Sequence, residues 1–193
     1  MRVIAGLAKG TPLETVPGSG TRPVSDRVKE AVFNILGDSI VDSHVLDLFA
    51  GTGSIGIEAL SRGAAWVVLV EKQPKAIATV RTNLARTRLQ AGARVVQADV
   101  FRFLAGTPEP FDLIYIAPPQ YQGLWSRTLL ALEANPSWLR PDGLAIVQIF
   151  PKELTPLTLT SLHLTDQRKY GSTLVCFYAA KRRPGSNEPP AET

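Results

Sequence analysis

The chain has 193 residues, of which 45% are hydrophobic, and carries 21 lysines and arginines against 17 aspartates and glutamates. This length suits one domain with a full core, while the lack of any apolar run near the ~20 residues that cross a bilayer excludes a membrane-spanning protein. One cysteine and two histidines exclude a disulfide framework and a Cys/His metal site, and the net charge of +4 is compatible with a polyanionic partner without requiring one.

The composition shifts divide the chain into three parts. Residues 1–20 combine a short apolar run with glycines and prolines, which predicts a small β-hairpin or a loose arm. Residues 21–181 should form the main domain, and the polar, proline-rich residues 182–193 a flexible tail. We expect a cytoplasmic monomer with no membrane partner and no metal.

A helix is predicted directly after the arm. Ser25 is placed to cap it, Asp26 and Glu30 lie near its positive end, and Gly37 stops it. The apolar residues between them recur at helical spacing.

Short apolar runs then alternate with helical segments, which is typical of an open, mainly parallel sheet covered by helices. The predicted strands are 44–50, 66–71, 94–99, 111–117 and 144–150. The predicted helices between them are 54–62, 74–90, 100–105 and 124–139. Two further strands within 161–181 have only a turn at Gly171 between them, so they should pair antiparallel at one edge. The expected fold is therefore α/β and Rossmann-like, with seven strands and an antiparallel C-terminal edge.

A glycine-rich turn follows the first of these strands. Gly51, Gly53 and Gly56 have the GxGxxG spacing that lets backbone approach a ligand, and Glu71 follows about 20 residues after Gly51, at the distance where an acid meets ribose hydroxyls. A dinucleotide such as NAD and S-adenosylmethionine both suit this layout.

Two further acidic residues favour S-adenosylmethionine. Asp47, four residues before the first glycine, would repel a pyrophosphate but suits a positive amino or sulfonium group. Asp99, after the third strand, offers an acceptor for an adenine amine, although a strand-end aspartate often only caps the next helix. The predicted cofactor residues are Asp47, Phe49, Gly51, Gly53, Gly56, Glu71, Lys72, Asp99 and Val100.

Two consecutive prolines end the fourth strand, in the stretch Ala117-Pro118-Pro119-Gln120-Tyr121. Neither proline has an N–H, so what remains is a stiff row of carbonyl acceptors, which could simply stop the strand. Beside a methyl donor, such acceptors could instead hold the hydrogens of an exocyclic amine and aim its lone pair. The expected catalytic residues are Ala117, Pro118, Pro119 and Tyr121.

Residues 1–180 as a whole resemble the bacterial 16S ribosomal RNA guanine-N2 methyltransferases of the RsmD type. The resemblance is carried by "TRPVSDRVKEAVFNIL", "VLDLFAGTGSIGIEALSRGA" and "FDLIYIAPP". It implies a class I methyltransferase fold, S-adenosylmethionine as cofactor, and 16S ribosomal RNA or a 30S assembly particle as partner. It also implies that the segment from Arg22 lies beside the active site.

The sequence departs from the motif of this family at two positions. Ala117 stands where the family usually has Asp, which leaves only the carbonyls of Ala117 and Pro118 as acceptors, and Gln120 stands where an aromatic ring normally stacks on the base. Tyr121 is one residue further on. Transfer could therefore be slow, or the acceptor altered.

The basic residues near the predicted first helix are candidates for RNA binding. Arg22 and Arg27 flank a helix start at Ser25 whose free N–H groups suit a phosphate. Arg2, Lys9 and Lys29 could extend this surface, and the expected substrate-binding residues are Arg22, Ser25, Arg27 and Gln120.

Three functions remain open from the sequence. The leading one is methyl transfer to the N2 amine of a guanine in 16S ribosomal RNA. The second keeps the cofactor but changes the acceptor to adenine N6 or a protein amide. The third is an RNA-binding module that has lost transfer through Ala117 and Gln120.

Overall fold

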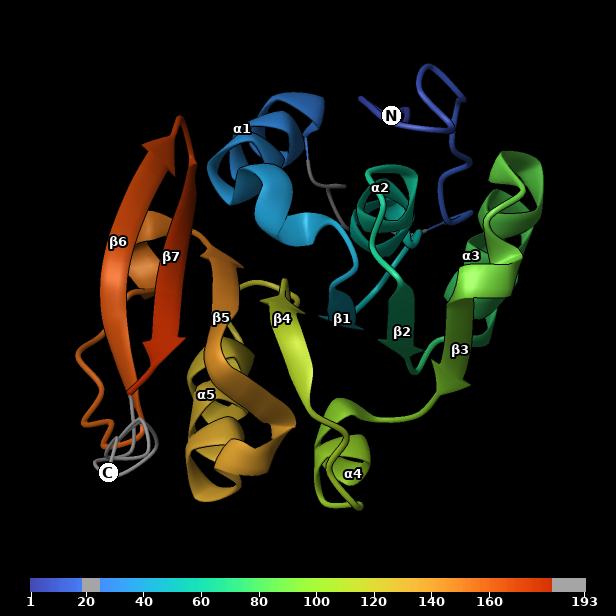
Figure 1. Cartoon of the computed structure of the whole chain (residues 1–193). Coiled ribbons are helices and arrows are strands. Elements are labelled where there is room, and N and C mark those ends of the chain that lie inside the picture. Colours follow the sequence, from blue (N-terminus) through green and yellow to red (C-terminus); the bar gives the residue numbers. More distant parts are fainter. Residues whose placement is uncertain (19–24, 182–193) are drawn as a thin grey trace, which may run out of the picture.

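One sheet of seven strands runs through the protein, with helices on both of its faces (Figure 1). The computed structural model describes residues 1–18 and 25–181. The strands are β1 (His44–Leu48), β2 (Trp66–Glu71), β3 (Ala93–Gln97), β4 (Phe111–Ile116), β5 (Leu139–Ile149), β6 (Leu162–Tyr170) and β7 (Thr173–Ala180). Their order is β3-β2-β1-β4-β5-β7-β6; β1 to β5 are parallel, and β7 is antiparallel to β5 and β6. The predicted seven-stranded, mainly parallel sheet is confirmed.

The helices divide between the two faces of this sheet. They are α1 (Asp26–Leu36), α2 (Ser54–Ser61), α3 (Pro74–Thr87), α4 (Val100–Leu104) and α5 (Leu124–Ala134), with the 3-10 turns η1 (Gly37–Ile40), η2 (Gln90–Gly92), η3 (Pro136–Trp138) and η4 (Pro151–Glu153). Figure 1 shows α1, α2 and α3 on one face and α4 and α5 on the other.

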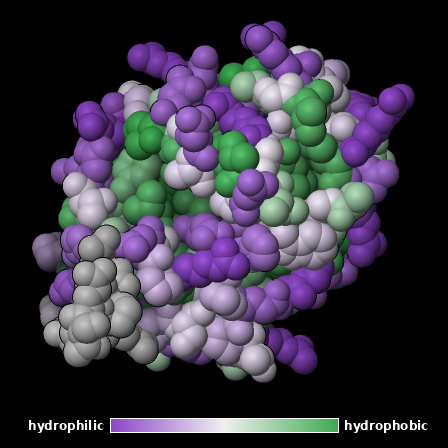
Figure 2. Space-filling model, in the orientation of Figure 1, coloured by the Kyte–Doolittle hydropathy of each residue, from purple (hydrophilic) through white to green (hydrophobic). Residues whose placement is uncertain are grey.

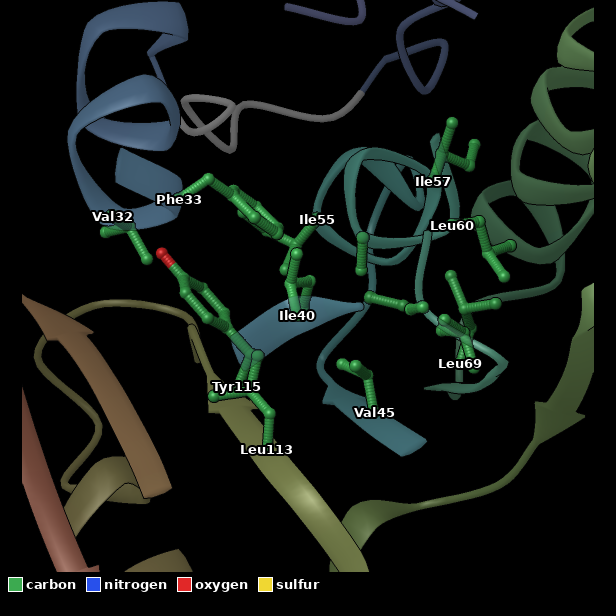
Figure 3. Close-up of a cluster of buried hydrophobic side chains, with 14 of the residues drawn as sticks. Val32, Phe33, Ile40, Val45, Ile55, Ile57, Leu60, Leu69, Leu113 and Tyr115 are labelled. Atoms are coloured by element: carbon green, nitrogen blue, oxygen red, sulfur yellow. The ribbon is translucent and has the colours of Figure 1, made fainter. Parts of the chain in front are cut away.

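The core consists of two apolar layers, one on each face of the sheet, because side chains of a strand alternate between faces. In β1, Val45 faces the layer under α1 and α2, and Leu46 faces the layer under α4 and α5; both are fully buried. Figure 3 shows the first of these layers, where Phe33 of α1 and Ile55 of α2 meet Tyr115 of β4.

The start of α1 agrees with the prediction from the sequence. The Ser25 hydroxyl accepts a hydrogen bond from Val28 N–H at 3.3 Å, which satisfies one of the free donors of the first turn. The helix ends at Gly37, whose φ of +52° suits a residue without a side chain.

The boundary between α5 and β5 differs from the prediction. The helix expected over 124–139 ends at Ala134, and the strand expected from residue 144 begins at Leu139. Pro136 explains this early end, because a proline disfavours helical backbone at the preceding residue, and Asn135 has a φ of −135°.

The N-terminal segment is a closed hairpin-like loop that packs on the domain. Its two sides join at an antiparallel bridge between Arg2 and Pro12. Val3, Ala8 and Leu13 are buried in the core layer under α1 and α2, so of the two predicted alternatives, a hairpin or a loose arm, the structure agrees with the hairpin. We call residues 1–14 the N-terminal arm. Residues 182–193, the expected tail, lie outside the described residues.

The surface mixes polar and apolar groups. Figure 2 shows hydrophilic side chains over most of one face, with hydrophobic ones gathered mainly in its upper half. Among the described residues, no helix has the length and apolar character needed to span a bilayer.

Candidate active site

The glycine-rich turn follows the carboxyl end of β1. Gly51 has a φ of +56°, and a Cβ there would meet only the carbonyl of Phe49, 3.9 Å away. Phe49 itself has a φ of +65°, which is uncommon for a residue with a side chain. The turn therefore leaves open space at Gly51, where a ligand can approach the backbone closely.

Gly53 and Gly56 are needed for packing between α2 and its neighbours. A Cβ at Gly56 would lie 2.8 Å from side-chain atoms of Leu69 and Val67, and one at Gly53 would lie 3.2 Å from Leu69 and Val80. At Gly56 a side chain would require its neighbours to shift, and at Gly53 the contacts are tight and the φ of +77° disfavours a side chain, so both glycines let α2 approach β2 and α3. Of the three glycines predicted for the cofactor, Gly51 is the one that borders open space.

Asp47 lies at the next-to-last position of β1 and is almost fully buried. Its Oδ2 accepts a hydrogen bond from Gly56 N–H at 3.1 Å. Burial raises the pKa of Asp47 to about 7; the hydrogen bond from Gly56 opposes this rise, and the negative charge of Glu71 adds to it. A cationic group bound nearby would favour the ionised carboxylate, which fits the amino or sulfonium group expected from the sequence.

The raised pKa of Asp47 predicts a stability gain on neutralising this side chain. Because the pKa is higher in the folded than in the unfolded chain, folding takes up a proton, and stability is lost as the pH rises from about 4 to about 7. Asp47→Asn can keep the hydrogen bond to Gly56 without the charge. We expect it to raise the free energy of unfolding by about 1–3 kcal/mol at pH 8 and by less at pH 5. Urea unfolding at both pH values measures this.

Asp112 supplies the matched control for this prediction. Burial alone would raise its pKa, but hydrogen bonds from His44 N–H and Arg140, together with the positive charge of Arg140, outweigh burial and lower it. Asp112→Asn should therefore destabilise the protein, and more at pH 8 than at low pH. If Asp47→Asn also lost stability at pH 8, our account of Asp47 would be wrong.

Glu71, the last residue of β2, ties the glycine-rich turn to the next loop. Its Oε2 accepts from Gly51 N–H at 3.0 Å, and its Oε1 accepts from the N–H groups of Lys72 and Gln73, both at 2.8 Å. Oε1 uses both of its lone pairs in this way, whereas Oε2 keeps one for a further donor, such as a hydroxyl group. The Lys72 side chain is exposed, and Lys72 takes part in this arrangement only through its backbone N–H.

Asp99 follows β3 and caps α4. Its Oδ1 accepts from Phe101 N–H at 2.9 Å and Arg102 N–H at 3.4 Å, so the capping role considered for it is real. Asp99 is exposed, and its second oxygen makes neither of these two hydrogen bonds. The Val100 side chain packs in the core layer under α4, which leaves its backbone as the part a ligand could contact.

The proline pair follows the point where β4 stops pairing with its neighbours. Ile116 is the last β4 residue in register with β1 and β5, so Ala117 and Pro118 lie beyond the ladder. Ala117 is half-buried and Pro118 buried, whereas Pro119 and Gln120 are exposed. A cavity of about 80 Å³ opens here, lined by Ala117, Pro118, Gln120, Gln148, Ile149, Ser172 and Thr173.

Tyr121 lies at the rim of this region and is 66% exposed. Its N–H donates to Glu153 Oε2 at 2.8 Å, and its ring stacks on Phe150 with centroids 5.4 Å apart and planes 14° apart. Phe150 thereby covers one face of the ring, and the remaining exposed surface is available to a base.

The basic surface expected at α1 is only partly present among the described residues. Arg27 is exposed, and Ser25 uses its hydroxyl for the helix cap. Arg22 lies outside the described residues. Lys29 is fully buried, so the expectation that it extends an RNA-binding surface is wrong.

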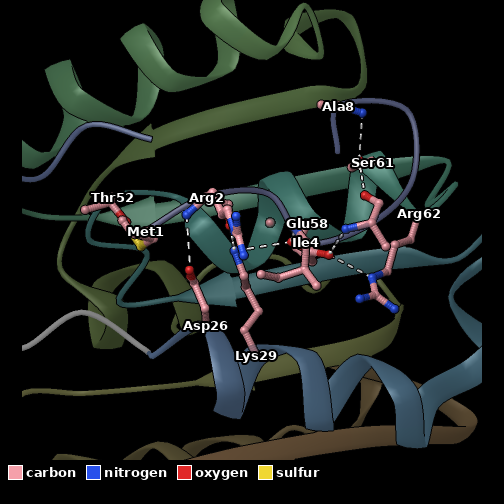
Figure 4. Close-up of polar contacts among 12 residues, drawn as sticks. Met1, Arg2, Ile4, Ala8, Asp26, Lys29, Thr52, Glu58, Ser61 and Arg62 are labelled. Atoms are coloured by element: carbon pink, nitrogen blue, oxygen red, sulfur yellow. Dashed lines mark hydrogen bonds and ion pairs between the residues drawn. The ribbon is translucent and has the colours of Figure 1, made fainter. Parts of the chain in front are cut away.

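Lys29 belongs to a buried ion cluster that holds the N-terminal arm (Figure 4). Its Nζ donates to the Arg2 carbonyl at 2.6 Å and lies 3.2 Å from Glu58 Oε2. Glu58 also accepts from the N–H groups of residues 4–5 at 2.8 and 3.1 Å, and from Arg62 Nε at 2.8 Å. Burial lowers the pKa of Lys29, and the charge and hydrogen bond of Glu58 oppose this.

The sequence did not point to Asn83, which joins the arm to the glycine-rich turn. Its Nδ2 donates to the carbonyls of Glu14 and Thr52 at 3.1 and 2.9 Å, and its Oδ1 accepts from Glu14 N–H at 2.8 Å. The available signal was a polar residue three positions after Val80 on the buried face of a predicted helix.

The sequence also did not point to Tyr115 and Gln148. The Tyr115 hydroxyl donates to Gln148 Oε1 at 2.7 Å, next to the cavity at Ala117. Tyr115 is the one hydrogen-bonding side chain in the apolar strand segment "LIYI", and Gln148 is the one in "LAIVQI". Such isolated polar residues are the feature of the sequence that could have marked both positions.

A larger cavity lies at the opposite end of the parallel strands. It has a volume of about 320 Å³ and is lined by residues where β1, β4 and β5 begin, among them Ser43, Asp112 and Arg140. It includes none of the predicted site residues. Among residues 1–18 and 25–181, no group of three or more His, Cys, Asp or Glu side chains could hold a metal ion.

The sheet order and the acidic strand ends beside a glycine-rich turn define a class I methyltransferase fold. An RNA methyltransferase from Salinibacter ruber, solved with S-adenosyl-L-homocysteine, has the same fold at 14% identity, with a TM-score of 0.65 over 86% of this chain and 98% of that one. The family described as "Conserved hypothetical protein 95" matches residues 1–179, and the chain belongs to this RsmD-type family.

Individual relatives agree with this family assignment. "Putative rRNA methyltransferase YlbH" of Bacillus subtilis (strain 168) is 39% identical over 181 residues, which cover 92% of this chain and 98% of that protein. "Ribosomal RNA small subunit methyltransferase D" of Escherichia coli (strain K12) is 40% identical over 149 residues, or 77% and 74% of the two chains. The solved structure of "Putative methyltransferase yhhF" from Escherichia coli superposes with a TM-score of 0.84 at 34% identity, over 94% and 98% of the two chains.

Proposed function

We propose that this protein is an S-adenosylmethionine-dependent methyltransferase of ribosomal RNA, and that its acceptor is the N2 amine of a guanine in 16S ribosomal RNA. The supporting observation is that the proline pair after β4 and the open turn at Gly51 both follow carboxyl ends of adjacent strands, β4 and β1. Ligands of open α/β sheets bind at this edge. Kinship to the small subunit methyltransferase D of Escherichia coli supports the choice of ribosomal RNA.

The residues at this edge fit the proposed cofactor. The space at Gly51 admits it, the free lone pair of Glu71 Oε2 suits a ribose hydroxyl, and Asp47 suits a positive charge. The oxygen of Asp99 that does not cap α4 can accept from an adenine amine. When bound, S-adenosylmethionine supplies an electrophilic methyl group on a positively charged sulfur.

The acceptor amine would be held by the end of β4. The carbonyl oxygens of Ala117 and Pro118 would accept the two N2 hydrogens, which orients the nitrogen lone pair and makes it more available. Tyr121 would stack on the base with the ring surface that Phe150 leaves uncovered. A paired guanine cannot reach this site, so the base must be unpaired or flipped out.

Cofactor titration by calorimetry tests the first half of this proposal. We expect S-adenosylmethionine to bind and NAD to fail. Glu71→Gln removes the charge while keeping the shape, and should weaken binding about tenfold, which corresponds to ~1.4 kcal/mol. Glu109→Gln is the matched control, since Glu109 is half-exposed and paired with Arg94. Binding of NAD in place of S-adenosylmethionine would refute the proposal.

Methyl transfer tests the second half. Purified protein with labelled cofactor should methylate 30S particles that lack the modification, and nucleoside analysis should show N2-methylguanosine. N6-methyladenosine would identify a different acceptor, and RNA binding without any transfer would favour the RNA-binding module.

A further inference from the structure

The Tyr115 hydroxyl is a polar group in an apolar layer. Tyr115 is 1% exposed, and its hydroxyl points towards α1 near Val32 (Figure 3). Burial and the negative charge of Asp47 raise the pKa of Tyr115, so the phenol keeps its proton at neutral pH. A buried hydroxyl needs a partner, and Tyr115 donates to Gln148 Oε1 at 2.7 Å.

This hydrogen bond fixes the orientation of the Gln148 amide. The phenol donates to the amide oxygen here, so Oε1 faces Tyr115 and the NH2 group is turned to the other side. Gln148 follows Val147, the last β5 residue paired with β4, just as Ala117 follows Ile116. Both therefore line the same cavity, and the Gln148 NH2 is a donor held at its wall.

On the basis of the proposed function, we infer that Gln148 is a specificity-determining residue whose NH2 donates to the ring nitrogen N3 of the target guanine. The N2 amine of guanine lies between N3, an acceptor, and N1–H, a donor. With the amine held by the carbonyls of Ala117 and Pro118, a donor at Gln148 pairs with N3 and cannot pair with N1–H. Gln148 thus selects which edge of the base lies against β5.

The cavity agrees with this role. With a volume of about 80 Å³ it is small, which suits contact with one edge of a base. The other polar side chains along it are Gln120, which is exposed, Ser172 in the turn between β6 and β7, and Thr173, the first residue of β7. Gln148 differs from them because a buried residue, Tyr115, anchors it.

Gln148→Glu tests this inference, because glutamate has the same shape and can still accept from Tyr115. It replaces the NH2 group by an oxygen that repels the N3 lone pair. We expect kcat/KM for ribosomal RNA to fall about tenfold or more, with unchanged affinity for S-adenosylmethionine by calorimetry. Gln167→Glu makes the same chemical change on the exposed strand β6 and should leave the rate unaltered.

Chemical substitution of the base separates a direct contact from a structural effect. Once the target guanine is mapped, an RNA fragment carrying 3-deazaguanine there lacks the N3 acceptor. We expect the native protein to methylate this fragment about tenfold more slowly than the unmodified fragment. The Gln148→Ala variant should methylate the two fragments at the same rate. Equal or faster transfer by Gln148→Glu, or additive losses in this cycle, would overturn the inference while leaving the proposed function intact. Failure of the native protein to form N2-methylguanosine would overturn both.

Discussion

Replacing Glu58 by alanine should lower the free energy of unfolding by about 3–5 kcal/mol, because it leaves the Lys29 ammonium buried without its counter-charge. Glu58 and Lys29 side chains are both fully buried, so water cannot take the place of the carboxylate. The same change leaves the N–H groups of residues 4–5 without their acceptor. Urea unfolding at constant pH measures the loss.

Two further variants separate the effect of the unpaired buried charge on stability from the effect of shortening a side chain. Glu109→Ala removes an ion pair whose partners are both half-exposed, and should cost no more than about 1 kcal/mol. Lys29→Met combined with Glu58→Gln removes both charges and should recover part of the loss caused by Glu58→Ala. A cost for Glu58→Ala as small as that of Glu109→Ala would show that the cluster does not stabilise the fold.

Ala117→Asp should raise the rate of methyl transfer about a hundredfold or more, since one preorganised hydrogen-bonding group in a catalytic site is worth about 2.7–4 kcal/mol. The new carboxylate would border the cavity at the end of β4 and add an acceptor to the two carbonyls there. Single-turnover methylation of 30S particles with saturating cofactor measures the chemical step. The size of the increase also shows how far Ala117 limits the rate of methyl transfer in the natural protein.

The matched variant is Ala117→Leu, which occupies the same space without an acceptor. It should slow transfer by excluding the base edge. An unchanged rate in Ala117→Asp would mean that the carbonyls alone hold the amine. Absence of transfer in the native chain and in Ala117→Asp would favour an RNA-binding protein.

The sheet and its order could be predicted from the sequence because the signals are local. Apolar runs mark the strands, the turn at Gly171 leaves no room for a crossover, and the fold rules restrict the rest. The predicted end of α5 is wrong although its signal is local as well. The helical pattern continues past Asn135, and the constraint that Pro136 places on the residue before it was not taken into account.

Side-chain roles that depend on distant partners could not be predicted. A lysine near a helix start reads as a surface charge, and the burial of Lys29 depends on Glu58, which lies 29 positions further along the chain. Likewise, the spacing of the glycines predicts an open turn but not that Gly53 and Gly56 face side chains of β2 and α3. The anchoring of Gln148 by Tyr115 depends on register between strands far apart in sequence.

The attachment of the N-terminal arm has a consequence for biosynthesis. Its contacts reach 54 residues along the chain, from Ile4 to Glu58, and 69 residues from Glu14 to Asn83. Because synthesis proceeds from the amino terminus, the N-terminal arm emerges before its partners, and its contacts are complete only after α3 has left the ribosome. The glycine-rich turn, which Asn83 braces from the same position, therefore reaches its final shape only after that delay.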